Sequence, residues 1–342
     1  MNRLGAALSA LKNAENRGPS TINVTTKGET VNASFALHGS LTSVLTLIFT
    51  IGSANAAGYS WKEILIPSIG PMGAAFGPND KGQVAVTNAD GTKTGIYRSG
   101  IFTPLPPAPA GYTVAAQGIN NSGTIVGFAL SPSDPTHQQG FILIGSKYAF
   151  FSRPGWDNTA PRAIANSGLI TGYNFTSDQS SFAGFVYSAS TNTFTDATPP
   201  GSGDGFSVTQ GMNSDRRISG DGRSPDLGRY GFVWQQGPQV RGSRQLAPFL
   251  ARLKLADEAT AARGINDAGI IVGFTGRPDG TSVGFVGSDS RGFQLLVPPG
   301  GDAPEANIAC EGINNFRQVV CQVADAAGNV REFIGSPDEN DQ

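Results

Sequence analysis

The chain has 342 residues, a formal net charge of −2 at pH 7, 46 glycines, 22 prolines and only 15% charged residues. Disorder requires low hydrophobicity with high net charge, and a hydrophobic content of 39% at this charge excludes it for the chain as a whole. No basic run is present, which excludes a nucleic-acid-binding surface, and two histidines and two cysteines are too few for a histidine cluster or a structural zinc site.

Residues 1–57 have the features of a leader with a signal peptide. Residues 1–36 are polar and predict no strand or helix, whereas Leu41 to Ile51 form an apolar stretch of signal-peptide length. The Ala-x-Ala pattern that follows predicts cleavage near residues 56/57, and about 20 apolar residues would be needed to cross a membrane. We therefore expect a secreted, periplasmic or extracellular protein with no membrane span in the mature chain. The alternative is a disordered tail before a buried apolar strand, because the nearest strong positive charge, Lys27, lies far upstream.

A repeated unit fills residues 58–342. Its clearest copies begin at Gly118, with Gly-Ile-Asn-Asn-Ser-Gly-Thr-Ile-Val-Gly-Phe, at Gly264, with Gly-Ile-Asn-Asp-Ala-Gly-Ile-Ile-Val-Gly-Phe, and at Gly312. Weaker copies begin at Gly77, Ala163 and Gly211, so that successive copies start 41 to 53 residues apart. A period in this range is typical of a repeat architecture.

Each copy continues with a polar loop and then a glycine or glutamate followed by an apolar run. These runs begin at Gly95, Gly140, Gly184, Gly231, Gly284 and Glu332. A fourth short apolar run follows in most copies and often ends in proline. Four short strands per unit predict an all-β fold, a six-bladed β-propeller of four-stranded blades, over a parallel β-helix, whose coils are usually shorter.

The last copy lacks its fourth strand. The apolar run Tyr59 to Pro67 resembles the fourth strands of the other copies, so we expect this N-terminal strand to complete the last blade and remove the open sheet edges.

The repeated asparagine is explained by turn chemistry. Asparagine at the first position of a type I turn bonds its own backbone, and glycine at the last position accepts positive φ. Structural turn roles are therefore predicted for Asn79, Asn120, Asn213, Asn266 and Asn314.

The two cysteines, Cys310 and Cys321, flank the sixth hairpin. An even-numbered turn over residues 314–317 would place Ile313 opposite Gln318 and Cys310 opposite Cys321, which predicts a cross-strand disulfide. A one-residue bulge would shift this register and separate the cysteines.

These units resemble the HAF repeat of bacterial extracellular proteins, whose pattern runs Gly-Ile-Asn-x-x-Gly-x-Val-Val-Gly, a spacer, and then His-Ala-Phe. The resemblance covers about residues 59–336, but no copy keeps the histidine. It implies an extracellular propeller-like protein without an established activity, and it transfers no catalytic residue.

Function is expected in the variable loops on the face opposite the asparagine turns. The loops between the second and third strands carry aspartates, which suit either turns or a ring for a cation, and turn chemistry is favoured. The ligand-binding candidates on this face are Tyr112, Asp134, Trp156, Asp157, Asp178, Arg223, Asp226, Arg277 and Asp279. Trp156 has an alternative role in packing between blades.

The sequence favours a monomeric binding or interaction module for carbohydrate or an envelope protein, with no cofactor or metal. A carboxylate-dependent glycoside hydrolase or lyase and a structural envelope repeat protein remain alternatives, and no catalytic residue is predicted. A Ser-His-Asp triad would have to use His137, which lies in a polar loop.

Overall fold

The computed structural model describes residues 21–26, 29–34, 58–198, 206–224, 228–235, 241–245, 259–277, 279–288 and 290–338. The chain forms two units, residues 1–52 and 53–342. In the first unit, strands β1 (Thr21–Thr26) and β2 (Glu29–Ser34) pair antiparallel, with Val24 opposite Val31. This hairpin corrects the expectation that residues 1–36 hold no strand, and its threonines and valines suit a pleated sheet. The apolar region 41–51 and the cleavage position near 56/57 lie outside the described residues.

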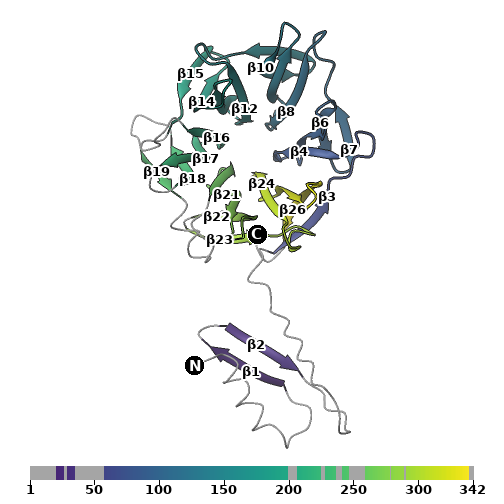
Figure 1. The fold of residues 1–342 in the computed structure, drawn as a ribbon, viewed down its shortest axis with the longest axis vertical. Coiled ribbons are helices and arrows are strands. Elements are labelled where there is room, and N and C mark those ends of the chain that lie inside the picture. Colours follow the sequence, from purple (N-terminus) through teal and green to yellow (C-terminus); the bar gives the residue numbers. More distant parts are fainter. Residues whose placement is uncertain are drawn as a thin grey trace, which may run out of the picture. The chain divides into compact units, whose positions relative to one another are not determined.

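The second unit is a six-bladed β-propeller, as the repeats predicted (Figure 1). The strands of blades 1, 2 and 3 are, in order, β4 Met72–Phe76, β5 Val84–Asn88, β6 Thr94–Arg98, β7 Ile101–Pro104; β8 Thr113–Ile119, β9 Ile125–Ser131, β10 Asp134–Ile144, β11 Lys147–Phe151; and β12 Asn158–Ile164, β13 Leu169–Phe175, β14 Phe182–Ser188, β15 Thr193–Asp196.

The strands of blades 4, 5 and 6 follow the same order. They are β16 Ser207–Met212, β17 Arg217–Ser224, β18 Gly228–Gln235, β19 Arg241–Gln245; β20 Thr260–Ile265, β21 Ile271–Gly276, β22 Ser282–Ser288, β23 Gly292–Leu296; and β24 Asn307–Ile313, β25 Val319–Ala324, β26 Val330–Pro337 with β3 Tyr59–Glu63. No helix among these described segments is long and apolar enough to cross a membrane.

Blade 6 is closed by the N-terminal strand, which confirms the predicted closure. β3 pairs antiparallel with β26, with Trp61 opposite Gly335 and Tyr59 opposite Pro337. The ring of Trp61 covers Gly335 so closely that a Cβ there would lie 2.7 Å from it. The two ends of the propeller are therefore joined in one sheet.

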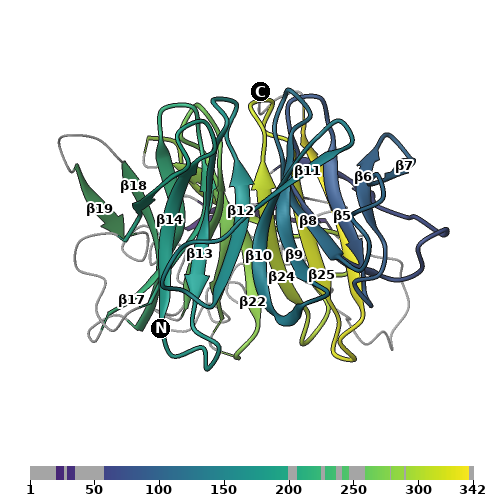
Figure 2. The same cartoon turned by 90° about the horizontal axis from the view of Figure 1, so that it is seen from above.

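The antiparallel order gives the propeller two faces, which are seen edge-on in Figure 2. The turns between first and second strands lie on one face, which we call the turn face. The loops between second and third strands, and the connections between blades, lie on the other, which we call the loop face. First strands line the axis (Figure 1).

The core lies between neighbouring blades. The phenylalanine after the third-strand glycine is fully buried in blades 2 to 5, as Phe141, Phe185, Phe232 and Phe285, and Phe333, which follows Glu332 in blade 6, is 1% exposed. The glycine itself allows the next blade to approach, because a Cβ at Gly184 would lie 2.7 Å from Thr209 Cγ2 and one at Gly284 would lie 2.7 Å from Cys310 Sγ. Blade packing thus accounts for the Gly-Phe pair.

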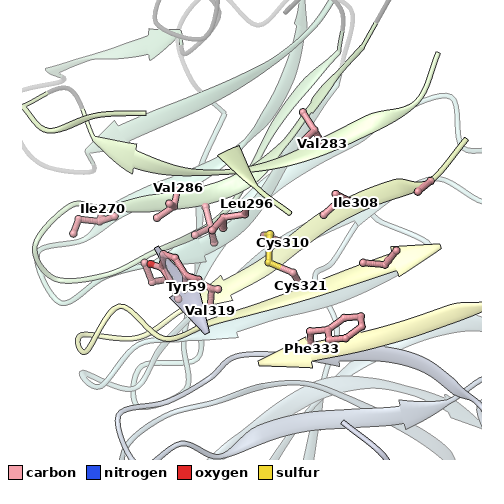
Figure 3. Packing of buried hydrophobic residues seen from close by; sticks show 14 residues of the cluster. Tyr59, Ile270, Val283, Val286, Leu296, Ile308, Cys310, Val319, Cys321 and Phe333 are labelled. Atoms are coloured by element: carbon pink, nitrogen blue, oxygen red, sulfur yellow. A yellow bond between two sulfur atoms is a disulfide. The ribbon is translucent and has the colours of Figure 1, made fainter. Parts of the chain in front are cut away.

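The predicted disulfide between Cys310 and Cys321 is present within a buried apolar cluster (Figure 3). The predicted turn was wrong by one residue, since Ile313 faces Val319 and not Gln318. A bulge in β24 between Cys310 and Gly312 offsets that extra residue and restores the Cys310–Cys321 pairing. The longer turn and the bulge therefore cancel, and the bulge does not separate the cysteines.

Candidate functional site

A β-bulge interrupts the inner strand of every blade. In blades 2 to 6 it falls immediately before the pair that opens the repeat, which is Gly-Ile in blades 2, 5 and 6, Ala-Ile in blade 3 and Gly-Met in blade 4. The residues at these bulges are Gln117, Arg162, Gln210, Arg263 and Glu311. In blade 1 the bulge falls at Gly73, and Phe76 occupies the corresponding place before Gly77. Bulges redirect side chains out of the regular pleat. These six side chains line one axial cavity of about 110 Å³.

Arg162 crosses the channel at this level. Its Nε donates to Gln210 Oε1 at 2.8 Å, its Nη1 donates to Gln117 Oε1, and its Nη2 donates to Glu311 Oε2 at 3.2 Å. The guanidinium also lies over the ring of Phe76, 4.4 Å from the centroid. One side chain thus joins five of the six blades at the axis.

Arg263 is bonded less completely than Arg162. Its Nη1 lies 3.8 Å from Glu311 Oε2, its guanidinium carbon lies 5.3 Å from the centroid of Phe274, and its buried Nε has no hydrogen-bond partner. Burial lowers the pKa of Arg162, whereas for Arg263 the charges of Glu311 and Asp221 outweigh burial and raise the pKa. Guanidinium groups stay protonated in proteins, so both side chains carry a buried positive charge.

Asp221 lies in strand β17. Its side chain is fully buried, accepts from Arg229 Nε at 2.7 Å and lies 3.4 Å from Gln210 Nε2. Arg229 is therefore paired with Asp221 beside the bulge residues.

On the turn face, the asparagines do more than close their turns. The turn role is visible at Asn314, whose Oδ1 accepts from the backbone N–H groups of Phe316 and Gln318. Its Nδ2 also donates to Asn79 O of the next blade at 3.0 Å. The same bond runs from Asn79, Asn120, Asn213 and Asn266 to their next blades.

The next residue in the turn of each repeat, which in blade 3 follows Ala165, can add a second link. Its side-chain oxygen accepts a backbone N–H of the preceding blade, and the accepting residues are Asp80, Asn121, Asn166, Asp267 and Asn315. Neither link joins blade 3 to blade 4 among the described contacts, because Ala165 and Ser214 take the two positions there. The turn face is thus a hydrogen-bonded ring with one gap.

On the loop face, most aspartates are held by their own turns. Asp178 Oδ1 accepts from the Thr176 hydroxyl at 2.6 Å and from the N–H and hydroxyl of Ser180, and these hydrogen bonds lower the pKa of Asp178 to about 2. Asp279 similarly accepts from the hydroxyl and N–H of Thr281. Among the described residues, no group of three or more His, Cys, Asp or Glu side chains could hold a metal ion.

Asp134 and Asp157 belong to one surface network. His137 Nδ1 lies 2.8 Å from Asp134 Oδ2, and His137 Nε2 lies 2.9 Å from Ser177 Oγ. Ser177 Oγ donates to Asp157 Oδ2 at 2.8 Å, so the imidazole must donate to Ser177 rather than accept from it. A hydrolase triad needs the opposite direction of that bond, so Ser177, His137 and Asp134 do not form one. Hydrogen bonds from His137 and Ser177 lower the pKa values of Asp134 and Asp157, respectively.

The remaining candidates lie apart from one another. Trp156 is half-buried, and its backbone N–H donates to Arg153 O at 3.3 Å. Arg223 is exposed, with its guanidinium carbon 5.0 Å from the Phe206 centroid, and Arg277 Nη1 donates to Thr281 Oγ1. Asp226 lies outside the described residues.

Tyr112 lines a pocket of about 690 Å³ on the loop face between blades 1 and 2. Its ring stacks on Phe150 with centroids 4.4 Å apart, and it is half-buried. Phe102, Leu105 and Pro106 add apolar surface, and Thr92 and Lys93 add polar groups. Lys93 Nζ donates to Ser68 O at 3.0 Å, which holds the ammonium at this pocket.

The channel residues were missed by sequence reasoning. A signal was present, because the residue before the pair that opens the repeat is polar or charged in five of the six copies. That pattern would have indicated a polar axis.

No family model and no curated protein matches the chain. Among solved structures, a luciferin-regenerating enzyme is 10% identical over 82% of this chain and 95% of its own, with a TM-score of 0.51. Streptogramin B lyase is 11% identical over 80% and 97%, and Aleuria aurantia lectin in complex with alpha-methyl-L-fucoside is 12% identical over 81% and 91%, both with TM-scores of 0.45. At such identities the likeness shows the fold alone: the protein is a β-propeller, here with six blades.

Proposed function

We propose that this protein is a secreted carbohydrate-binding module and that the pocket around Tyr112 is its ligand site. The observation that carries the proposal is the pocket of about 690 Å³ between blades 1 and 2, which falls in the size range of small-molecule sites. The disulfide is compatible with an oxidising compartment.

The lining of this pocket suits a sugar. Tyr112 and Phe102 offer aromatic surface to the C–H face of a pyranose, while Lys93 and Thr92 offer polar groups to its hydroxyls. A glycoside hydrolase would need two carboxyl groups across the ligand, and among the described residues that line this pocket none is acidic. We therefore propose binding without cleavage here.

A glycan array followed by calorimetry on the strongest ligand tests this function. We expect Tyr112→Ala to weaken binding at least 10-fold, Tyr112→Phe to retain most of it, and Trp156→Ala to leave it unchanged. Thermal unfolding of each variant establishes that the protein is folded, because Tyr112 also packs on Phe150. A blank array together with a blank pull-down from envelope extract would reject the proposal and favour the structural role.

A further inference from the structure

The bulge residues leave an excess of positive charge at the axis of the propeller. Arg162 and Arg263 both face the single carboxylate of Glu311, at 3.2 Å and 3.8 Å. The next carboxylate, Asp221, is already paired with Arg229 at 2.7 Å. Among the described residues around the axis, three guanidinium groups therefore share two carboxylates, and the side chains of Arg162 and Arg263 are only 14% and 18% exposed.

Glu332 does not correct this imbalance at neutral pH. Burial raises the pKa of Glu332 to about 8, and the charge of Glu311 acts in the same direction. The carboxyl group is therefore mostly neutral at pH 7 and supplies little negative charge.

The free hydrogen-bonding capacity belongs to Arg263. All three donor nitrogens of Arg162 have acceptors, whereas Arg263 Nε is buried with none. A buried donor without an acceptor costs free energy, and a buried charge without a partner costs more. Both costs fall if an anion binds to this guanidinium.

The space beside Arg263 has the size of a small anion. The axial cavity of about 110 Å³ has room for roughly three to four water-sized groups, since water occupies about 30 Å³ in the liquid. A sulfate, a phosphate or a carboxylate group is of this size. Gln117 and Gln210 line the same cavity, with their amide oxygens on Arg162.

We propose that the axial cavity is a binding site for a small oxyanion, with Arg263 as the residue that recognises it. The planar guanidinium presents parallel N–H donors that match two oxygens of a carboxylate, sulfate or phosphate group. This site is distinct from the pocket around Tyr112, so either site stands if the other fails.

The test is a titration with sodium sulfate and, separately, with sodium acetate at constant ionic strength set by sodium chloride. Calorimetry measures the affinity, and thermal unfolding measures the shift in Tm. For the wild-type protein we expect saturable binding and a rise in Tm with at least one of the two anions. Preference between them distinguishes a tetrahedral oxyanion from a carboxylate.

Arg263→Gln should bind at least 10-fold more weakly than wild type, and Arg98→Gln should bind as wild type does. Arg98 is an exposed arginine in β6, away from the residues that line the cavity, and so controls for net charge. If Arg263→Gln does not fold, Arg263→Lys takes its place, with an expected loss of at least 3-fold because lysine has no planar fork. The proposal is overturned if wild type binds neither anion, or if the folded Arg263 variant binds both as tightly as wild type.

Discussion

Glu332 stands where the other five blades have glycine, at Gly95, Gly140, Gly184, Gly231 and Gly284. It is 1% exposed, accepts from Gln322 Nε2 at 3.1 Å and from the backbone N–H of Ala75 in blade 1, and its Oε2 has no partner. Blade 6 thus buries a carboxyl group at a position where the other blades have no side chain.

Glu332→Gln should make stability less dependent on pH. Burial raises the pKa of Glu332 to about 8, whereas its unfolded value is near 4.5. Below pH 4.5 both states are protonated; between pH 4.5 and 8 the unfolded state releases its proton first, so native stability falls as pH rises. We expect the variant to gain roughly 3–5 kcal/mol over wild type at pH 8.5 relative to pH 4, from about 1.4 kcal/mol per pKa unit. Urea unfolding across this range measures the gain.

Glu63→Gln is the matched control and should have the opposite sign. Arg331 donates to Glu63 at 2.6 Å and 2.9 Å and lowers the pKa of that carboxyl, so its stabilisation is present above pH 4.5 and lost on acidification. If the free energy of unfolding changes with pH in the same way for Glu332→Gln and for wild type, Glu332 ionises freely in the folded protein and the prediction is wrong.

At the scale of the element, the hairpin of each repeat both turns the chain and joins neighbouring blades. The turn was predictable, because an asparagine that bonds its own backbone is a local pattern. The link from Asn314 to Asn79 was not, because these residues lie 235 positions apart and become neighbours only when the propeller closes.

Repairing the gap between blades 3 and 4 should stabilise the propeller. Ala165→Asn would supply the donor for Asn213 O, and Ser214→Asn would supply the acceptor for the Asn166 N–H, as at the equivalent positions of the other blades. Each new hydrogen bond should add about 0.5–1.5 kcal/mol to the free energy of unfolding. Chemical denaturation of the double variant measures the sum.

The control for this repair is Asn314→Ala, which removes an existing link and its turn contacts. It should destabilise the protein, by an amount larger than either repair adds, because buried partners lose their bonds. Repair variants that are no more stable than wild type would show that backbone spacing at this junction does not allow the links.

At the scale of the whole molecule, stability depends on the pairing of β3 with β26. Deleting residues 58–66 as well as 1–57 should expose the edge of β26 and uncover Gly335, which Trp61 covers. We expect this chain to lose cooperative unfolding and to form oligomers in size-exclusion chromatography. Deleting residues 1–57 alone should leave a folded propeller. A monomeric, cooperatively folded 67–342 chain would show that closure is dispensable.

Blade number and closure were predictable because they follow from counting repeats and from one missing strand. The bulges were not, since register depends on a single residue and β24 reached the predicted Cys310–Cys321 pair only through two cancelling offsets. Of the candidate site, Tyr112 was predicted as a loop aromatic, but the pocket around it requires blades 1 and 2 to be packed together. The charged axis was missed because it forms from five distant strands.

A residue at a β-bulge has no ladder partner, so its side chain can be exchanged without changing the strand pairing around it. In this chain such positions hold two glutamines, two arginines and a glutamate on otherwise similar hairpins. The selectivity of the axis can therefore evolve, or be engineered, one blade at a time while the scaffold stays constant. A library randomised at these five positions would sample new axial chemistries on one unchanged fold.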